Sequence, residues 1–475
     1  MRVLRYTLLM VFWFAIPGTK GVFAALPPQV TQALARADIS EESVAVVVRP
    51  VAELTPTLFH RADVAMSPAS VMKLLTTYTA LQILGPAYTW KTEAFSDGVV
   101  DQGSLRGNLY IKGYGDPKLT VEQLWLFLKR IRAAGVKVIA GDVILDTSYF
   151  AAVVREPSDF DGQPLRAYNA NPSALLINYN AININLSVDT SQQRVKTWME
   201  PGFAALKLVN HVTLDPGPCG DWRNQLNLKI DGSGNARKLQ LSGKFSIHCE
   251  EKNYAASFFT PTDFAGDLIL DLWQEMGGKL RGRVHVGETP QDATMLARLE
   301  SPPLSTVITD VNKWSNNVMA RQLYLTLGAK YAAAPATSDK SFGVVNQWLL
   351  SKNLNFPELV LENGSGLSRS ERISAGHLAD LLIDAWKSPV MPQFIASLPI
   401  AAIDGTMKNR LKENGIAGRA YIKTGSLEGV KTLGGYVLDK NGRWMTVVSL
   451  INHPQAGKAR EAEDALLAWV YEGGH

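Results

Sequence analysis

Three short segments of this chain hold residue types that together can carry out acyl transfer. They are Ser70–Lys73 (SVMK), Ser315–Asn317 (SNN) and Lys423–Gly425 (KTG), in that order. Acyl transfer needs a nucleophile, a base, donors that stabilise an oxyanion and groups that hold the substrate. Each segment alone is a weak signal, and the pattern Ser-x-Asn also occurs at Ser233 and Ser351. The order of the segments and the sequence around them make the combination informative.

Ser70 and Lys73 are the candidates for nucleophile and base. Apolar residues recur at helical spacing after Ser70, which predicts a helix with one buried face. Positions three apart on a helix share a face, so the two side chains are expected to meet. A lysine has a reference pKa of about 10.4, but the first turn of a helix, burial and the second cation Lys423 all disfavour its charge. We therefore expect Lys73 to have a lowered pKa and to take the Ser70 proton; the alternative is an ordinary pair on a solvated helix face.

The sequence around these segments resembles the penicillin-binding proteins and serine β-lactamases. Within that group it resembles the D-Ala-D-Ala carboxypeptidase/endopeptidases, the class C low-molecular-mass penicillin-binding proteins. The segments that carry the resemblance are Ser67–Thr76, Gly113–Pro117, Asn363–Arg369, Asp404–Met407 and Lys423–Leu427. The resemblance implies a serine enzyme that acts on peptidoglycan stem peptides and cross-links and that β-lactam antibiotics acylate.

One position departs from the family pattern. Many members carry Asp where this chain has Asn363. The difference concerns a contact beside the active site and leaves the nucleophile unaffected.

Ser315 and Asn317 are expected to serve the same reaction. Ser315 would relay a proton from Lys73 toward the leaving amine, and Asn317 would hydrogen-bond the substrate amide. The pattern predicts that Ser315 lies on a long amphipathic helix over residues 306–327. The alternative is a helix N-cap pair, because Ser and Asn are common choices there. The apolar residues that continue the helix after Asn317 favour the active-site interpretation.

Lys423 and Thr424 are predicted on a strand, where Gly425 permits a close backbone approach. The resemblance implies that they bind the C-terminal carboxylate of a D-Ala-D-Ala stem peptide. It also implies that the backbone N–H groups of Ser70 and Ser426 form the oxyanion hole. A donor of this kind contributes about 3–4 kcal/mol to transition-state stabilisation. Residues 404–406 and 363–366 are expected to shape the rim of the site, or else to be plain turns.

Composition excludes several other classes of protein. The chain has 475 residues, 48 basic and 44 acidic, with a net charge of +4. This balance, without Lys/Arg runs interleaved with aromatic residues, argues against a nucleic-acid-binding protein. Only two cysteines are present and His-Glu-x-x-His does not occur, so no zinc site and no cofactor are expected.

The N-terminus resembles a secretory signal peptide over residues 1–24. Arg2 and Arg5 precede an apolar stretch at residues 7–16, and small residues before position 25 suit cleavage after Ala24. The alternative, a membrane anchor, would need roughly 20 apolar residues. Because residues 461–475 also lack a basic amphipathic tail, we expect an exported periplasmic protein with no integral membrane span.

Cys219 and Cys249 are expected to form a disulfide, because export leads to an oxidising compartment. Such a bond would close a loop of about 30 residues and stabilise the fold by about 3 kcal/mol. The alternative is a pair of separate buried thiols.

The order of predicted elements indicates an α/β (α+β) fold. The interval between Lys73 and Ser315 is far longer than a minimal acyl-enzyme domain needs. We therefore predict a discontinuous catalytic domain, residues 25–90 plus 296–475, interrupted by an inserted α+β region at residues 91–295. The resemblance implies that the catalytic domain has the serine transpeptidase/β-lactamase-like fold. Predicted strands of the insert lie at residues 105–112, 136–146, 178–188, 226–230 and 238–241, and its helices at 121–134 and 263–276.

Three rival functions were weighed against a serine D-Ala-D-Ala carboxypeptidase/endopeptidase. A serine β-lactamase would need efficient deacylation, and the long insert and the flanking segments disfavour it. A non-catalytic wall-binding protein of the same fold is disfavoured by the intact residues Ser70, Lys73, Ser315, Asn317 and Lys423. A partner of a transglycosylase finds no support, because no second catalytic module is evident.

Overall fold

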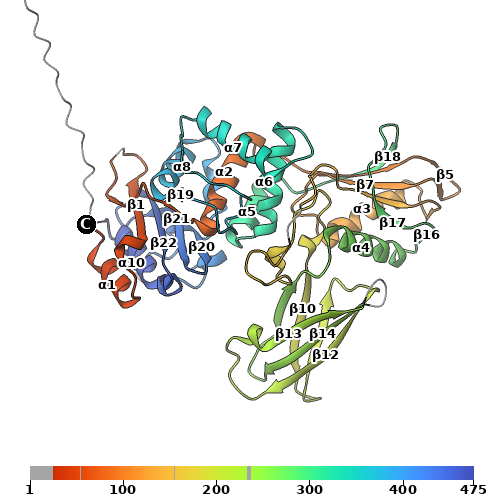
Figure 1. The fold of residues 1–475 in the computed structure, drawn as a ribbon, viewed down its shortest axis with the longest axis horizontal. Coiled ribbons are helices and arrows are strands. Elements are labelled where there is room, and N and C mark those ends of the chain that lie inside the picture. Colours follow the sequence, from red (N-terminus) through yellow and green to blue (C-terminus); the bar gives the residue numbers. More distant parts are fainter. Residues whose placement is uncertain (1–24, 54, 154–155, 233–236, 414, 475) are drawn as a thin grey trace, which may run out of the picture.

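The computed structural model divides the protein into two lobes (Figure 1). The red beginning and the blue end of the chain lie together in one lobe, and the orange-to-green middle of the chain builds the other. The predicted signal peptide at residues 1–24 lies outside the described residues. The residues that the structure describes are 25–53, 55–153, 156–232, 237–413 and 415–474.

A five-stranded antiparallel sheet forms the centre of the first lobe. Its strand order is β2-β1-β22-β21-β20, so strands from both ends of the chain pair directly. Its strands are β1 (Val44–Pro50), β2 (Leu58–His60), β20 (Ala420–Leu427), β21 (Val430–Leu438) and β22 (Trp444–Asn452). The β1–β22 pairing places Val46 opposite Ser449. The catalytic lobe, as we name this sheet with its helices, is therefore closed only by the last part of the chain.

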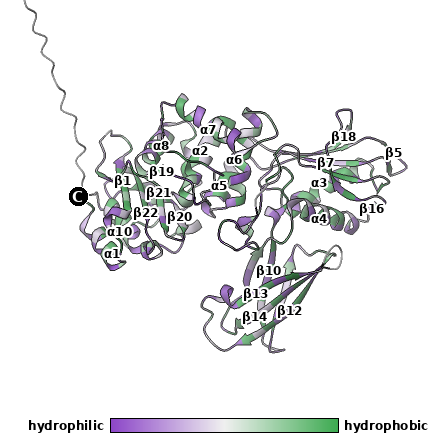
Figure 2. Ribbon diagram, viewed as in Figure 1, coloured by the Kyte–Doolittle hydropathy of each residue, from purple (hydrophilic) through white to green (hydrophobic). Residues whose placement is uncertain are grey.

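Helices cover both faces of this sheet, which explains why β1 is apolar from Val44 to Val48. Successive side chains of a strand point to opposite faces. Val44, Val46 and Val48 belong to the core beneath α1 and α10, whereas Ala45 and Val47 belong to the core beneath α2 and α8. Figure 2 shows the resulting mixture of hydrophobic and hydrophilic residues along the same elements. The helices of this lobe are α1 (Pro28–Arg36), α2 (Lys73–Leu84), α5 (Leu304–Lys313), α6 (Asn317–Tyr331), α7 (Ser338–Ser351), α8 (Ala375–Lys387), α9 (Met391–Ala396) and α10 (Arg460–Tyr471).

The second lobe, which we name the inserted lobe, has a separate hydrophobic core made of buried residues between Ala94 and Leu299. A five-stranded sheet of order β17-β9-β7-β4-β18 and a four-stranded sheet of order β16-β8-β6-β5 pack with two helices. The elements are β4 (Lys91–Ser96), β5 (Val99–Asp101), β6 (Ser104–Arg106), β7 (Leu109–Gly113), α3 (Val121–Ala133), β8 (Val138–Ile139), β9 (Val143–Asp146), α4 (Pro261–Glu275), β16 (Lys279–Leu280), β17 (Val284–Val286) and β18 (Thr294–Glu300).

Two strands predicted in this lobe as continuous are each divided in two. The predicted strand 105–112 becomes β6 and β7, and 136–146 becomes β8 and β9. The breaks fall at Gly107 and Gly141, whose backbones touch: Gly141 N donates to Gly107 O at 3.1 Å. A Cβ on Gly141 would lie 2.5 Å from that oxygen. Glycine permits this close approach, and each half-strand then joins a different sheet.

Below these sheets in Figure 1, two three-stranded sheets face each other. Their orders are β11-β10-β15 and β12-β14-β13, and the predicted pairing of residues 226–230 with 238–241 is present as the antiparallel pair β13–β14. The strands are β10 (Ile182–Asp189), β11 (Arg194–Glu200), β12 (Leu206–Asp215), β13 (Leu226–Asp231), β14 (Arg237–Ser246) and β15 (Lys252–Ala256).

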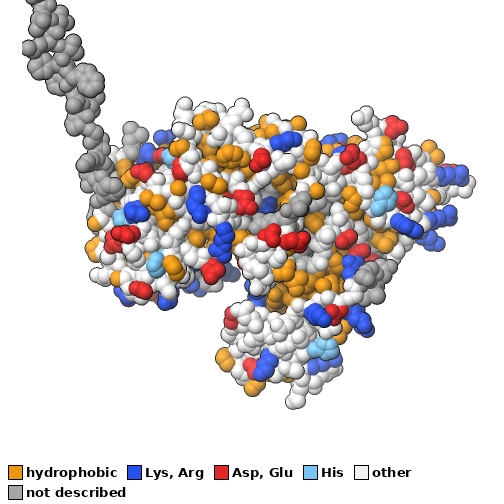
Figure 3. All heavy atoms as spheres, viewed as in Figure 1, with side chains coloured by type: hydrophobic (Ala, Val, Ile, Leu, Met, Phe, Trp, Pro, Cys, Tyr) orange, Lys and Arg blue, Asp and Glu red, His pale blue; other side chains and the backbone are white. Residues whose placement is uncertain are grey.

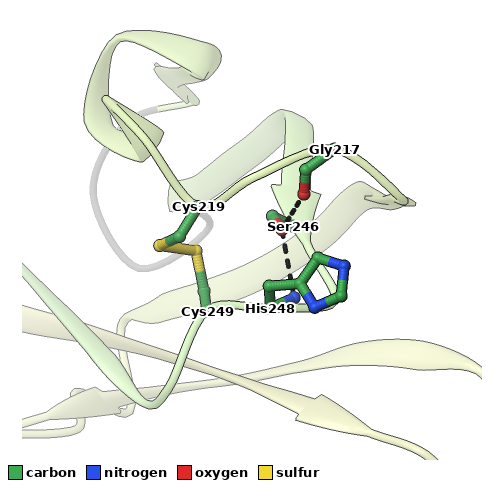
Figure 4. The surroundings of a disulfide bond; sticks show 5 residues. All are labelled: Gly217, Cys219, Ser246, His248 and Cys249. Carbon is green, nitrogen blue, oxygen red and sulfur yellow. Dashed lines mark hydrogen bonds between the residues drawn. A yellow bond between two sulfur atoms is a disulfide. The ribbon is translucent and has the colours of Figure 1, made fainter.

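The disulfide between Cys219 and Cys249 joins the segments that follow β12 and β14 (Figure 4). Beside it, Ser246 Oγ accepts a hydrogen bond from His248 N at 3.0 Å and donates one to Gly217 O. Both ends of the linked loop are thus held at the tip of the same sheet.

The charges on one face of the molecule and the apolar content of the described helices bear on whether the chain has a charged binding surface or a membrane span. On the face in Figure 3, Lys and Arg alternate with Asp and Glu instead of gathering in one field. Among the described residues, no helix combines the length and the apolar composition needed to cross a membrane.

Removing the disulfide is expected to destabilise the inserted lobe. In the double variant Cys219→Ser with Cys249→Ser, the unfolded chain regains the entropy of a loop that spans a sequence separation of 30 residues. The expected loss in free energy of unfolding is about 3 kcal/mol. Urea denaturation of the variant and the wild type under the same non-reducing conditions measures it. Equal midpoints and slopes for the two proteins would contradict the expectation.

Candidate active site

Ser70 lies in a 3₁₀ helix, Ala69–Met72, directly before α2. The residue ahead of it, Ala69, has a left-handed φ of 45°. Two contacts hold this turn in place. Thr432 Oγ1 on β21 donates to Pro68 O at 2.7 Å, and Gly366 approaches so closely that a Cβ there would lie 1.8 Å from Ala69 O. The sheet and a distant loop therefore fix the position of the nucleophile candidate.

Lys73 is completely buried and points at Ser70. Its Nζ lies 3.0 Å from Ser70 Oγ and 2.5 Å from Asn317 Oδ1, and it also contacts the backbone oxygen of Ser365. The predicted meeting of Ser70 and Lys73 on one face is thus present. Two of the three acceptors are carbonyl oxygens, which can accept hydrogen bonds but cannot donate them.

The pKa of Lys73 is lowered well below its ordinary value. Burial is the largest cause, because removal from water penalises the ammonium form. The positive charge of Lys423 lowers the pKa further, whereas the buried Glu371 carboxylate raises it. The balance favours a neutral amine, which has one lone pair and two N–H groups.

The prediction that Ser315 lies within one helix over residues 306–327 is wrong. α5 ends at Lys313 and α6 begins at Asn317, and Ser315 between them has a left-handed φ of 56°. Asn316 caps α6, since its Oδ1 accepts from Met319 N at 3.0 Å. Ser and Asn side chains compete with helical hydrogen bonds and favour such ends. The break turns Ser315 and Asn317 into the cleft.

Lys423 lies beside Ser315, on β20. Its Nζ donates to Ser315 Oγ at 2.8 Å and to Thr424 O at 2.7 Å. Burial lowers the pKa of Lys423 to about 7. Ser315 is therefore hydrogen-bonded to Lys423, whereas the sequence analysis expected Ser315 to relay a proton from Lys73. Lys73 instead contacts Asn317.

Gly425 lets the edge strand β20 approach the nucleophile. A Cβ at this position would lie 2.2 Å from Thr432 Oγ1 and 3.0 Å from Ser70 N. Beside it, Thr424 Oγ1 donates to Thr406 Oγ1 at 2.8 Å, and Ser426 is exposed. A larger residue in place of Gly425 would push the strand away from Ser70.

The loop of residues 362–371 forms the floor under Lys73. Asn363 Oδ1 accepts from Ser365 N (2.9 Å) and Ser365 Oγ (2.6 Å), while its Nδ2 donates to Leu367 O at 3.1 Å. The hydrogen bond to Leu367 O needs an N–H donor, which asparagine has and an ionised aspartate lacks. Asn363, the position that departs from the family pattern, therefore organises the loop that presents Ser365 O to Lys73.

Glu371 is a buried carboxylate that the sequence argument missed. Its Oε1 accepts from three successive backbone N–H groups, those of Glu362 (3.1 Å), Asn363 (2.9 Å) and Gly364 (3.2 Å). Three amide donors favour the ionised form of a carboxylate, although burial raises the pKa of Glu371. No local motif marks Glu371, because its partners come from the turn it closes.

A cleft of about 650 Å³ opens above these groups. Besides Ser70, Ser315 and Asn317, it is lined by residues that the sequence argument did not assign, Phe160, Asp161 and Tyr168 of the inserted lobe and Arg369, Arg410 and Arg460 of the catalytic lobe. The Arg369 guanidinium lies 4.9 Å from the Phe160 ring centroid, so the two lobes touch across the cleft. No helix or strand is predicted over residues 147–177, so the sequence did not place Phe160, Asp161 or Tyr168 at the cleft.

Of the expected rim residues 404–406, Thr406 lines the cleft. Asp404 is held by Lys313 Nζ at 2.6 Å, and Thr406 contacts Thr424. These contacts tie the end of α5 to β20 on the side of Ser315.

Comparison with known proteins agrees with this geometry. The sequence profile of the D-Ala-D-Ala carboxypeptidase 3 (S13) family matches residues 26–472. The D-alanyl-D-alanine carboxypeptidase of Actinomadura sp. (strain R39) is 28% identical over 426 residues, which are 86% of this chain and 77% of that protein.

Solved structures share the fold. Penicillin binding protein 4 (dacB) from Haemophilus influenzae superposes with a TM-score of 0.77 at 23% identity, covering 93% of this chain and 99% of that one. Another structure of that protein, complexed with a β-lactam, gives 0.72. The Bd3459 predatory endopeptidase from Bdellovibrio bacteriovorus gives 0.52 at 18% identity over 90% of this chain and 91% of that one. This chain belongs to the D-Ala-D-Ala carboxypeptidase 3 (S13) family and is a serine D-Ala-D-Ala carboxypeptidase with the penicillin-recognising fold.

Proposed function

We propose that this carboxypeptidase works through an acyl-enzyme on Ser70, and that it is also a D,D-endopeptidase of peptidoglycan cross-links. The observation that carries the proposal is the set of neighbours of Lys73 Nζ. A neutral amine directs its two N–H groups to the carbonyl oxygens of Asn317 and Ser365, because these atoms only accept. Its lone pair is then left for the hydroxyl of Ser70, 3.0 Å away.

In the acylation step, Ser70 Oγ attacks the carbonyl carbon of the penultimate D-Ala, and its proton passes to Lys73. The oxyanion that forms is stabilised by the backbone N–H groups of Ser70 and Ser426. Support for this role comes from Gly425, which keeps β20 close to Ser70 N. Donors placed in this way are already oriented when charge develops and need no rearrangement.

The leaving amine receives its proton through Ser315. Because Ser315 Oγ accepts a hydrogen bond from Lys423, its own O–H can give its proton to the departing nitrogen. Lys423 then gives a proton to Ser315. Deacylation reverses the transfers: water gives a proton to Lys423 through Ser315 and attacks the ester carbonyl, and Lys73 returns its proton to Ser70. A pKa of about 7 suits Lys423 for both directions. Thr424 and the protonated form of Lys423 bind the C-terminal carboxylate of the substrate. Asn317 hydrogen-bonds the substrate amide.

The endopeptidase activity follows from the same chemistry with a larger leaving group. The leaving amine of a cross-link belongs to a second stem peptide, so it needs an open site. The cleft of about 650 Å³ provides the room, and its lining carries both Asp161 and Arg369 for a substrate with charges of both signs. A solved neighbour of the same fold is an endopeptidase by its name.

The proposal also covers the domain division, the destination of the protein and its reaction with β-lactams. Residues 91–295 are accessory domains inserted into a catalytic domain of residues 25–90 and 296–475, and their separate core supports this division. Residues 1–24 direct the protein to the periplasm, where peptidoglycan lies. β-Lactams acylate Ser70 as substrate analogues, in line with the β-lactam complex of a protein of the same fold.

Intact-mass spectrometry after treatment with penicillin tests the acyl-enzyme. The wild type is expected to gain one stable adduct per chain, and Ser70→Ala none, because the attacking oxygen is lost. Rapid penicillin turnover without an adduct would indicate a β-lactamase. Absence of both adduct and D-Ala release in the wild type would indicate a binding protein and refute the mechanism.

The pH profile tests the two lysines. The kcat/KM for D-Ala release from a short peptide should rise with pH as Lys73 loses its proton, since only the neutral amine is a base. It should fall as pH passes about 7, because Lys423 then loses the charge that holds the carboxylate. In Lys423→Arg the group stays charged, so the falling limb should disappear, while kcat/KM should be lower at every pH because a guanidinium does not release its proton to Ser315. A falling limb that persists in an actively acylated Lys423→Arg protein would exclude Lys423 as its source.

Glu371→Gln tests the charge beneath Lys73. Gln retains an oxygen that can accept the three backbone N–H bonds but removes the negative charge that raises the Lys73 pKa. The rising limb of the profile should therefore move to lower pH, because the Lys73 ammonium form loses a counter-charge. Asn363→Ala, which disturbs the same loop without removing a charge, is the control. An unchanged or upward-shifted limb in Glu371→Gln would contradict the electrostatic role.

A further inference from the structure

A second cleft lies directly beside the active-site cleft. Its volume is about 520 Å³, and it shares Tyr168, Ser315 and Asn317 with the cleft of about 650 Å³ above Ser70. The two hollows therefore meet along the Ser315–Asn317 segment. A ligand that fills the first one can continue into the second without leaving the protein surface.

Aromatic side chains from both lobes form the walls of this second cleft. Trp314, the residue before Ser315, is 65% exposed. Facing it across the lobe boundary are Tyr168, Tyr179 and Tyr254 of the inserted lobe. A large aromatic side chain left in water at the edge of a cleft marks a contact surface more often than a stability element. Flat rings of this kind stack on sugar rings and on peptide planes.

The wall that carries Tyr179 is built at an energetic cost. Residues 178–180 have three successive left-handed φ angles, 47°, 58° and 54°. Asparagine adopts this conformation readily, but at Tyr179 it costs on the order of 1–3 kcal/mol. Asn180 Nδ2 holds the turn by donating to Ser257 Oγ (2.9 Å) and Phe259 O (2.7 Å). Ser315 on the opposite wall is also left-handed. Strained backbone on both walls of one cleft is typical of ligand sites.

The charged side chains lining the cleft are arginines. Arg166 lies over the Tyr254 ring at 5.6 Å, and Arg223 lies over the Trp222 ring at 5.1 Å. Arg223 Nη2 also donates to Asn253 O at 3.4 Å. Among the described residues that line this cleft, none is acidic. Guanidinium groups held in this way favour carboxylates, which they bind through two parallel hydrogen bonds.

We propose that the second cleft binds the carboxylate-bearing stem peptide on the far side of a peptidoglycan cross-link. The proposal rests on the function proposed above and names the part of the substrate that this surface receives. A stem peptide offers peptide planes for the aromatic walls and free carboxylates for Arg166 and Arg223. A single linear peptide occupies the first cleft alone, whereas a cross-linked dimer spans both. The second cleft therefore makes the enzyme prefer cross-links over linear stem peptides.

Two substrates and three variants test the proposal. The substrates are a sugar-free D,D-linked peptide dimer and a linear peptide that ends in D-Ala-D-Ala. In Arg223→Gln and in Trp314→Ala, the ratio of kcat/KM for the dimer to kcat/KM for the linear peptide is expected to fall by about tenfold, through loss of one charge-assisted contact in the first variant and of one aromatic stacking contact in the second. The fall should come from a higher KM for the dimer, because uniform binding energy is lost. Arg281→Gln, at an exposed arginine of the inserted lobe, should leave the ratio unchanged.

The outcomes separate this proposal from the one it rests on. A ratio unchanged in both Arg223→Gln and Trp314→Ala would overturn the second-cleft assignment. If the ratio falls only when a dimer that keeps its disaccharides replaces the sugar-free dimer, the cleft binds glycan and the peptide assignment is overturned. Failure of the wild type to cleave any dimer, while it still releases D-Ala from the linear peptide, would refute the endopeptidase function itself.

Discussion

Two lysines buried within one site are the constraint on which the rest of this structure depends. Lys73 and Lys423 are both fully buried; burial lowers the pKa of each, and the positive charge of Lys423 lowers the pKa of Lys73 further. Water does not screen this repulsion inside the protein, so the two lysines need different surroundings. Carbonyl oxygens of Asn317 and Ser365 surround Lys73, whereas hydroxyl and backbone oxygens near the open cleft surround Lys423. In the proposed mechanism, Lys73 is the base and Lys423 is the cation that binds the substrate carboxylate.

Segments far apart in the chain must converge to hold these lysines. The helix that follows Ser70 carries Lys73, the edge strand β20 carries Lys423, and the break between α5 and α6 carries Ser315. The loop closed by Glu371 reaches beneath them and supplies the last acceptor. Glycines occur where these segments come closest, at Gly366 and Gly425, since a Cβ at either position would collide with a neighbouring backbone or side chain.

Local sequence was sufficient for some of these features and insufficient for others. The contact between Ser70 and Lys73 follows from helical spacing alone, and the burial of β1 follows from its unbroken apolar pattern. The prediction of one long helix over residues 306–327 was wrong. It followed the helical pattern of the whole segment and gave too little weight to the capping preference of Ser315 and Asn316. Glu371, Phe160 and Tyr168 gave no signal, since their roles arise only when loops distant in sequence meet.

The position of β1 in the sheet has a consequence for the newly made chain. One neighbour of β1 is the nearby β2, but the other is β22, from near the end of the sequence. Until translation reaches β22, a strand that is apolar from Val44 to Val48 keeps one row of N–H and C=O groups unpaired, a template for association with other chains. Contacts between the two ends of a long chain also form slowly. The catalytic lobe thus leaves the edge of a buried strand unprotected until its last strands are made, unlike a fold assembled from consecutive strands.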